Sequence, residues 1–405
     1  MSPMDEIALR YILLGLRLGR HHGELISSYT GPAELAEAVA GEEPVPPAEL
    51  HAEALRLADA VAELPTDTPI RRRRAAWLGD QLIALSALAR QADGEEIGFG
   101  DLAEELFDIQ VRAEPEETFA TARRMVEAAL PGTGSLQTRL LTHEQSATVP
   151  AEQVIPALRS LVEVMSRRAH AQLWLPPGES VTIEGVDGGD WEADMCYLGK
   201  GRSLVRVNLG LPVTIGQLVE LVAHECYPGH HLEAAVKEAL LVAAGHAEVS
   251  LQLDLAPEAV VREGLATYAR EVVMSDAELA LEVERLARHH GLSAAVGAEL
   301  MVQRARRLLL PAIGNAALQL HVDGQSPESV RGYLSDVALL AEARLEAVMS
   351  FLGDPTWRTY IFTYIEGRRL VGEWLVREGQ TQGFGRLLAE QLTPGQLRVA
   401  IGATG

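Results

Sequence analysis

The sequence is poor in cysteine, in aromatic residues and in positive charge, and each shortage excludes a class of protein. Its 405 residues include only two cysteines, Cys196 and Cys226, which is too few for a disulfide framework in a chain of this length. Disulfide-poor chains are typical of reducing compartments, so we expect a cytoplasmic protein.

Positive charge is scarce, because 35 lysines and arginines stand against 57 acidic residues and give a formal net charge of −22. A chain this acidic repels polyphosphate and anionic membrane surfaces, and its arginines form no stripe interleaved with aromatic residues. We therefore expect neither a nucleic acid nor a membrane as a partner.

Long apolar runs are also missing. No segment approaches the roughly 18 apolar residues that span a bilayer. The first residues include Asp5 and Glu6, where a secretory signal peptide carries basic residues. Neither membrane insertion nor export is expected.

Helix-forming residues dominate what is present. Alanine, leucine, glutamate and arginine are abundant while aromatic residues make up 5% of the chain. Straight-chain residues lose little rotamer freedom in a helix, so this composition favours helices over strands. The predicted fold class is mainly α. The length alone permits two or three domains or one large one.

Apolar spacing and stop signals predict where the elements lie. Residues 5–30 indicate mainly one helix, and the proline-rich residues 42–47 indicate a stiff connector. Within residues 174–213 the spacing alternates, which predicts a small β element of two or three strands at about 180–209. The other predicted helices are 48–63, 68–92, 101–111, 115–130, 214–227, 231–244, 257–274, 276–290, 292–310, 313–321, 326–352, 355–378 and 383–391.

One short segment concentrates the residues that carry chemistry. Residues 221–231 read Leu-Val-Ala-His-Glu-Cys-Tyr-Pro-Gly-His-His. A histidine followed at once by a glutamate is typical of zincin helices, in which the glutamate is the general base. In those helices a second histidine follows the first by four residues, but Pro228 occupies that position here. The spacing therefore needs a physical explanation.

A straight helix cannot bring the histidines of this segment to one ion. On a regular helix His230 would be turned about 120° from His224 and displaced about 9 Å along the axis. Zinc bonds of about 2.0–2.1 Å cannot bridge that separation. Pro228 interrupts a helix, and Gly229 can adopt a positive φ at little cost. We therefore predict a break that brings His230 or His231 back to His224.

The helix before the break supports a metal site. Its apolar residues recur at helical spacing and end at His224 and Glu225, which places both at the end of a buried face. An unpaired carboxylate there would be costly. A zinc hydrolase takes three protein ligands and leaves the fourth position to water. The candidates for the third ligand are Glu233, Glu248, Asp254, Glu263 and His246. Glu263 precedes Gly264, which would allow a neighbouring helix to approach closely.

These segments resemble a family of bacterial proteins called domain of unknown function 885, whose members are described as zinc metallopeptidases. The family pattern is His-Glu-x-x-Pro-Gly-His-His followed by Glu-Gly-Trp-Ala-x-Tyr. Residues 224–231 and 263–268 match it, with Leu265 in place of the tryptophan. Residues 14–32 resemble the opening of one branch of the family, and residues 321–326 and 364–368 resemble two C-terminal segments.

The resemblance implies a fold similar to the gluzincins of the carboxypeptidase Taq and thimet oligopeptidase group. That fold is a large helical zincin-like bundle around a channel, here as one superdomain over residues 1–405. A subdivision into an N-terminal helical lobe, 1–173, and a catalytic lobe, 174–405, stays open.

The resemblance also implies roles for individual residues. The ligands of Zn²⁺ would be His224, His230 and Glu263, with His231 as the alternative to His230, and Glu225 would be the base. His321 and Tyr364 are the candidate oxyanion donors. Tyr268 is a candidate substrate-binding residue, and Arg368 or Arg369 is the candidate to clamp a substrate carboxylate.

The expected function is that of a zinc-dependent metallopeptidase, which hydrolyses peptide bonds with water activated by zinc and Glu225. One alternative is a zinc amidase that acts on a small non-peptide amide. Another is a helical metal-binding protein without catalysis, although a purely structural zinc site needs no base such as Glu225. The sequence is also compatible with a homodimer.

Overall fold

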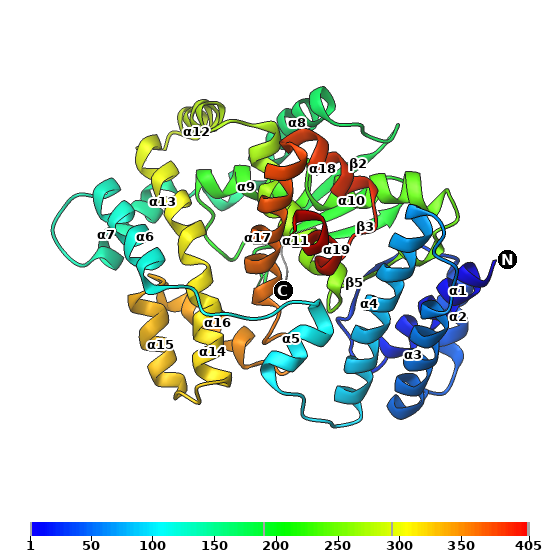
Figure 1. Ribbon diagram of the computed structural model, residues 1–405. Coiled ribbons are helices and arrows are strands. Elements are labelled where there is room, and N and C mark those ends of the chain that lie inside the picture. Colours follow the sequence, from blue (N-terminus) through cyan, green and yellow to red (C-terminus); the bar gives the residue numbers. More distant parts are fainter. Residues whose placement is uncertain (1, 189–190, 293–294, 403–405) are drawn as a thin grey trace.

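The computed structural model describes residues 2–188, 191–292 and 295–402, and most of them are helical (Figure 1). The predicted mainly α fold is confirmed. The α-helices are α1 (Pro3–Leu18), α2 (Ala33–Gly41), α3 (Pro47–Ala62), α4 (Pro69–Ala92), α5 (Phe99–Phe107), α6 (Glu116–Ala129), α7 (Leu136–Ala147), α8 (Ala151–Gln172), α9 (Ile215–Glu225), α10 (His230–Lys237), α11 (Pro257–Val273), α12 (Asp276–His290), α13 (Val296–Leu309), α14 (Pro311–His321), α15 (Pro327–Asp336), α16 (Glu342–Gly353), α17 (Ile361–Glu378), α18 (Gln380–Ala389) and α19 (Pro394–Ile401). A π-helical turn, η1 (Glu238–Val242), continues α10, and a short 3₁₀ helix, η2 (Ala247–Ser250), follows it.

The strands form two small sheets. β2 (Ser180–Val186), β3 (Ala193–Gly199) and β4 (Arg202–Asn208) make a three-stranded sheet in the order β2-β4-β3. β4 runs parallel to β2 and antiparallel to β3. This sheet confirms the β element predicted at about 180–209. The second sheet pairs β1 (Ile26–Tyr29) with β5 (Leu251–Leu253), and the sequence did not indicate it.

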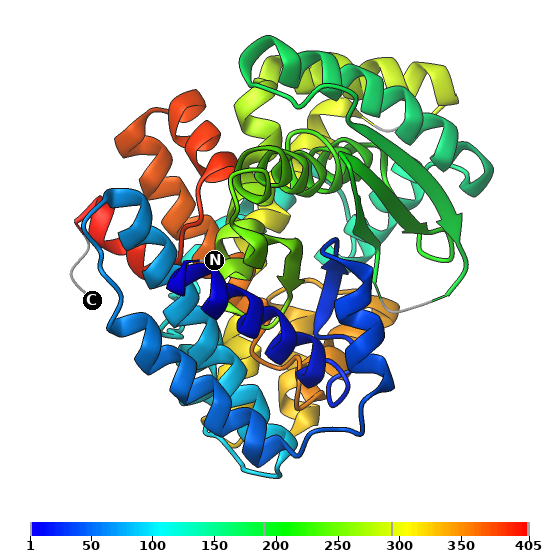
Figure 2. The same cartoon turned by 90° about the vertical axis from the view of Figure 1, so that its right-hand side faces the viewer.

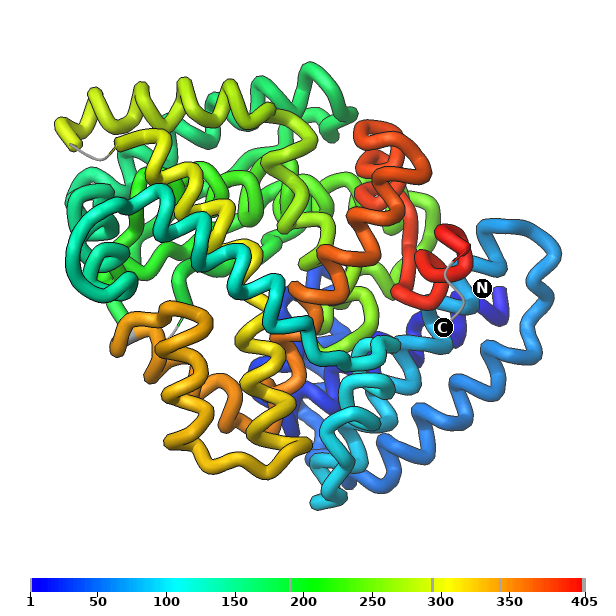
Figure 3. The backbone as a smooth tube through the Cα atoms, turned by 60° about the vertical axis from the view of Figure 1, so that its left-hand side comes forward, coloured from blue at the N-terminus to red at the C-terminus, as the bar shows by residue number. Residues whose placement is uncertain are grey.

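Two long helices, α11 and α17, pack against each other in the middle of the molecule (Figure 1). Figure 2 shows α8 lying over the three-stranded sheet, on the far side of the molecule from the blue N-terminal helices. In Figure 3 the red C-terminal helix α19 lies beside the blue N-terminal segment. Gln396 of α19 donates a hydrogen bond to the carbonyl oxygen of Arg73 in α4 at 3.1 Å.

A pair of glycines sets the distance between α11 and α17. A Cβ atom added at Gly264 would lie 2.3 Å from the carbonyl oxygen of Gly367. One added at Gly367 would lie 2.3 Å from the carbonyl oxygen of Val260. Both distances are far inside van der Waals contact, so the two backbones touch and no larger residue fits. The prediction that Gly264 allows a close helix approach is confirmed.

Three predicted helices are wrong in extent, and one of them, predicted over 355–378, begins only at Ile361. The helix predicted over 5–30 ends at Leu18, because the chain folds back at Gly19, where a Cβ would lie 2.7 Å from Cδ1 of Ile26. The helix predicted over 326–352 is two helices, α15 and α16, and between them Leu339 adopts a left-handed φ of 58°. The sequence also assigned no element to the segments that form α2, α7, α8 and α19.

A single cluster of buried apolar side chains contains residues from both sides of the boundary at 173/174, from α1 to α19. A buried ion pair adds to it: Arg74 of α4 donates to both carboxylate oxygens of Glu248, at 2.7 and 2.9 Å, and to Asp5 of α1 at 2.9 Å. Gln391, near the C-terminus, also donates to Glu248, at 3.0 Å. Among the described residues, we find no helix with the length and apolarity needed to span a membrane.

The close helix crossing predicts the effect of an added methyl group. Gly264→Ala should destabilise the fold by about 1–3 kcal/mol, because the methyl group must push α17 away. Gly332→Ala in α15 is the matched control, since nothing lies within 4 Å of the added Cβ and alanine favours helix. Chemical denaturation of both variants measures the difference. Equal stability of the two would contradict a backbone contact at Gly264.

Candidate metal centre

The helix that carries the first histidine is fixed at its start by a buried carboxylate. Thr214 accepts a hydrogen bond from the backbone N–H of Gln217 and so caps α9. Its hydroxyl donates to Glu299 at 2.6 Å, and the backbone N–H of Gly216 donates to the same oxygen at 3.1 Å. Glu299 is fully buried, and His143 contacts its other oxygen at 2.7 Å. This anchor sets the position of α9 from its N-terminus.

The helix breaks where the sequence predicts. α9 ends at Glu225 and α10 begins at His230, with a cis peptide bond between Tyr227 and Pro228. The predicted positive φ at Gly229 is wrong, because its φ is −75°. Glycine is required there for space instead: a Cβ would lie 1.8 Å from the carbonyl oxygen of His224. The chain therefore turns tightly enough to bring His230 back to His224.

Three side chains converge at this break, and we call them the trio: His224, His230 and Glu263. The two Nε2 atoms lie 3.0 Å apart, and Oε2 of Glu263 lies 3.2 Å from His224 Nε2 and 3.6 Å from His230 Nε2. Tetrahedral ligands with bonds of about 2.0–2.1 Å lie about 3.3–3.4 Å apart. Oε2 of Glu263 is also buried without a hydrogen bond of normal geometry from any described residue. The donor set and its spacing therefore fit a zinc ion.

The electrostatics of the trio follow from burial and mutual contact. Burial favours a raised pKa for Glu263, but His230 and His224 outweigh it and hold the pKa well below its usual range. Burial lowers the pKa of His224, while Glu263, Glu225 and Glu220 raise it to a net value above normal. Burial also raises the pKa of Glu225, and the two imidazoles only partly offset this. Glu225 is thus a nearly buried carboxyl group with raised proton affinity beside the trio.

Two tyrosines line the same site: Tyr360, just before α17, and Tyr364, in its first turn. Tyr360, which the sequence analysis missed, donates a hydrogen bond to Oε1 of Glu263 at 3.0 Å and so orients the carboxylate. The ring of Tyr364 lies 6.4 Å from that of His224. Burial, and then the nearby Glu263 and Glu225, raise the pKa of Tyr364 well above its usual value, so its hydroxyl stays protonated. No described residue forms a hydrogen bond with that hydroxyl, which leaves it available as a donor.

His231 is held by other partners. Its Nε2 lies 2.8 Å from a carboxylate oxygen of Glu179, and its Nδ1 lies 2.8 Å from the hydroxyl of Ser203. Both ring nitrogens are therefore engaged, and neither is left for a metal. The hydroxyl of Tyr227 donates to the same oxygen of Glu179. Glu179 thus holds Tyr227, which lies inside the break, and His231, which follows His230 in α10.

The other candidates for the third ligand each have a partner elsewhere. These contacts are Glu233 with Lys237 at 2.8 Å, Glu248 with Arg74 at 2.7 Å, Asp254 with Arg262 at 2.5 Å and His246 with Gln391 at 2.6 Å. Of the five candidates, Glu263 is the one whose carboxylate lies next to both His224 and His230.

His321 lies among other residues. Its Nε2 donates to the carbonyl oxygen of Leu352 at 2.7 Å, and its ring stacks on Phe99 with 5.0 Å between centroids. Because a carbonyl only accepts, this N–H is already used. None of the contacts between described residues joins His321 to the trio. Tyr364 is therefore the better placed of the two candidate oxyanion donors.

The candidate substrate-binding residues contact each other. The guanidinium of Arg368 lies over the ring of Tyr268, 4.2 Å from its centroid. Arg369 instead pairs with Glu366 and Glu373, both at 2.9 Å, and its side chain is 47% exposed. Of the two arginines, Arg368 is the one held near Tyr268.

No family model matches the sequence, and no curated protein matches it. Solved structures do match. The crystal structure of a "putative lipoprotein" from Colwellia psychrerythraea is similar with a TM-score of 0.69 and 12% identity over 99% of each chain. A "putative lipoprotein of unknown function" from Shewanella oneidensis has a TM-score of 0.48 and 13% identity, over 90% of this chain and 75% of that one. The Colwellia structure shows that this fold recurs from end to end in another protein.

The ligand assignment predicts different zinc affinities for two neighbouring variants. His230→Ala should abolish stoichiometric zinc binding, because it removes a ligand. His231→Ala should weaken zinc binding only about 10–100-fold, because it removes one of the two side chains that Glu179 holds beside His230. Chelator competition on folded samples, checked by circular dichroism, measures both. Equal zinc loss from the two folded variants would contradict the assignment.

Proposed function

We propose that this chain is a zinc-dependent peptidase. The observation that carries the proposal is the convergence of His224, His230 and Glu263 at ligand spacing. The nearly buried Glu225 follows His224 in the chain and interacts electrostatically with all three side chains. The resemblance to the domain of unknown function 885 family supports it independently, since the same residues fill that family's pattern.

In this proposal His224, His230 and Glu263 hold the zinc ion. The side chain of His224 is 22% exposed, so the site is open to solvent on the side of His224. A bound zinc ion supplies a Lewis acid that polarises the scissile carbonyl and lowers the pKa of a water molecule. Glu225 takes a proton from the attacking water and later delivers it to the leaving amine.

Tyr364 completes the arrangement as the oxyanion donor. Its protonated hydroxyl, without a partner among the described residues, is free to donate to the negative oxygen that develops on the carbonyl. Tyr360 fixes the carboxylate of Glu263 and is a positioning residue. These roles also fit the hydrolysis of a small non-peptide amide, so the substrate panel must contain both classes.

The central test replaces the base and keeps the metal ligands. Glu225→Gln should retain about one zinc per chain and lose about 10²–10⁴-fold in kcat, because proton transfer is lost. Glu373→Gln is the matched control, since Glu373 lies on α17 in a surface pair with Arg369. Metal analysis and turnover of a panel of peptides and small amides provide the measurement.

Two outcomes would defeat the proposal: a wild-type protein that binds no zinc, or a Glu225→Gln protein with full activity. Turnover of small amides without turnover of peptides would replace the peptidase with an amidase.

We also propose the cytoplasm as the compartment of this chain. Both cysteines are free thiols, which suits a reducing environment. Fractionation of cells that express the chain with a C-terminal tag should recover it with the cytoplasmic marker. Recovery with the envelope fraction would contradict this location.

A further inference from the structure

The three residues of the trio come from three different helices, which we call the ligand helices. His224 lies in the last turn of α9, His230 is the first residue of α10, and Glu263 lies within α11. Zinc bonds tolerate deviations of only about 0.2 Å, whereas a helix that slips by one residue moves about 1.5 Å along its axis and turns by about 100°. Apolar contacts fix such a register only weakly, because the hydrophobic effect is non-directional. The trio therefore needs directional contacts between the ligand helices.

A buried lysine joins α10 to α11. Lys237, the last residue of α10, lies 2.8 Å from Glu233 of its own helix and 2.7 Å from Glu258 of α11. All three side chains are buried. Apart from the contact within the trio, the pair of Lys237 and Glu258 is the only hydrogen bond or ion pair between these two helices among the described residues. The polar link between the helices of His230 and Glu263 therefore depends on this lysine.

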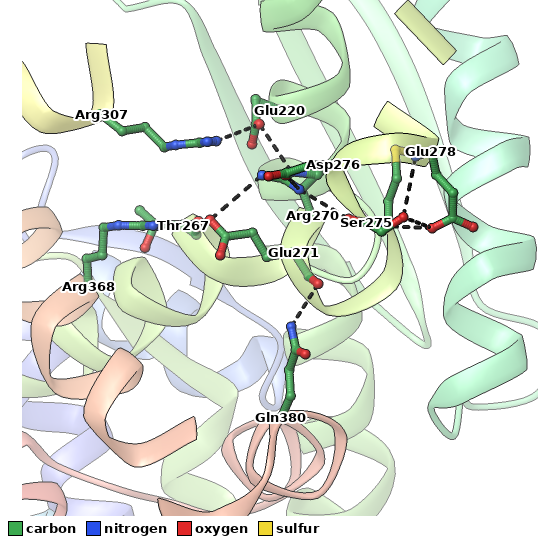
Figure 4. A network of polar contacts seen from close by, with 11 residues as sticks. Glu220, Thr267, Arg270, Glu271, Ser275, Asp276, Glu278, Arg307, Arg368 and Gln380 are labelled. Carbon is green, nitrogen blue, oxygen red and sulfur yellow. Dashed lines mark hydrogen bonds and ion pairs between the residues drawn. The ribbon is translucent and has the colours of Figure 1, made fainter. Parts of the chain in front are cut away.

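A buried arginine joins α9 to α11 in the same way. Arg270 of α11, whose side chain is only 2% exposed, donates from Nε to Glu220 of α9 at 3.3 Å. It also lies 3.8 Å from Glu271 of its own helix and 2.9 Å from Asp276. Figure 4 shows Glu220 between Arg270 and Arg307, which donates to the same acid at 2.8 Å. One buried cation thus connects α11 to each of the other two ligand helices.

Both cations lie seven residues after a member of the trio on the same helix. Lys237 follows His230 in α10 at this spacing, and Arg270 follows Glu263 in α11. Seven residues make nearly two full turns, so each cation lies on the same face as the ligand, about 10.5 Å further along the axis. A directional contact on that face fixes both the rotation of the helix and its axial position. The two cations are therefore placed to determine where the ligands lie.

We propose that Lys237 and Arg270 are positioning residues, which fix α10 and α9 against α11 and so hold the trio at ligand spacing. This rests on the zinc site of the proposed function. A slip of one residue would carry the charged atoms out of hydrogen-bond range and leave a buried charge unpaired, which is strongly destabilising. Apolar residues in place of a buried ion pair often keep the same stability. The expected contribution of these charges is therefore a unique helix register.

The first test removes one acid at a time from Lys237. Glu258→Met removes the contact that crosses to α11, whereas Glu233→Met, the matched control, removes the contact within α10. Both acids are buried and lie in the first turn of their helices, and each variant keeps one acid for the lysine. Glu258→Met should weaken zinc binding about 10–100-fold, as the loss of a contact that supports a metal ligand does. Glu233→Met should leave zinc binding near the wild-type value. Chelator competition measures both.

The same comparison applies to Arg270. Glu220→Met removes the contact that crosses to α9, and Glu271→Met, the matched control, removes the contact within α11. The two acids are 28% and 30% exposed, and each also pairs with one outer arginine, Arg307 or Arg368. Glu220→Met should weaken zinc binding about 10–100-fold, and Glu271→Met should leave it near the wild-type value.

Cobalt in place of zinc separates position from charge. Glu220 also interacts electrostatically with His224, so the loss of its charge lowers metal affinity by itself. The visible spectrum of bound Co²⁺ reports the ligand geometry instead. The two control variants should keep the wild-type spectrum, and the two crossing variants should change it. Circular dichroism checks the fold. If Glu258→Met does not fold, the uncharged triple variant Glu233→Met, Lys237→Met, Glu258→Met replaces it, with the same change of spectrum expected.

The outcomes separate the two proposals. A wild-type cobalt spectrum in the crossing variants overturns the positioning role while the peptidase stands. Equal zinc loss from each crossing variant and its control also overturns it, because the effect would then be one of charge alone. Altered spectra in the crossing variants, together with a wild-type protein that cleaves no peptide, overturn the peptidase and leave the positioning role. A wild-type protein without zinc overturns both.

Discussion

The contact between the backbones of α11 and α17 at Gly264 and Gly367 is the constraint on which the candidate site depends. Glu263 lies next to this contact on α11, while Tyr360 and Tyr364 lie one or two turns before Gly367. A side chain in between would separate the carboxylate from both tyrosines. Thr267 and Arg368 lie just beyond the same crossing and are joined by a hydrogen bond, so this contact also fixes how the two helices meet past the trio.

A second constraint acts from the other side, where α9 must stop and α10 must start within a few residues. Gly229 has no room for a Cβ, and Glu179 holds Tyr227 within the break and His231 just after it. Glu179 precedes β2, and Ser203, the other partner of His231, lies on β4 of the same sheet. The three-stranded sheet thus holds the break in place through Ser203 and Glu179. With His231 bound to these two residues, His230 is the histidine that faces His224.

The parts of the site that follow from local spacing could be predicted from the sequence. A regular helix cannot bring His224 and His230 together, so Pro228 and Gly229 had to interrupt it, and the structure has that break. The reason for Gly229 was predicted incorrectly, because the need is for space and depends on how closely the chain returns to the carbonyl of His224. Choosing Glu263 among five candidates required the family resemblance. In the structure Glu263 lies at ligand spacing from His224 and His230, and each of the other four candidates has a polar partner of its own.

The contacts that side chains from distant segments make with the site could not be predicted from the sequence. Glu179 and Tyr360 reach the site from the loop before β2 and from the edge of α17, and no spacing rule connects them to residues 224–231. The sheet of β1 and β5 escaped prediction for the same reason, since its two short strands lie far apart in the chain. The role of His321 as an oxyanion donor stays a prediction, and the structure shows its ring engaged with Leu352 and Phe99.

The buried carboxylate of Glu248 connects the two ends of the chain energetically. Arg74 pairs with Glu248 and also with Asp5 of the first helix. Gln391, in the C-terminal segment, donates a hydrogen bond to Glu248. Loss of Gln391 removes a hydrogen bond to a buried charge, which is worth about 1.5–3 kcal/mol. A truncation at the C-terminal end would therefore weaken the seat of the N-terminal helix as well. Trimming from opposite termini should not be additive, since each cut removes one partner of the same Arg74–Glu248 ion pair.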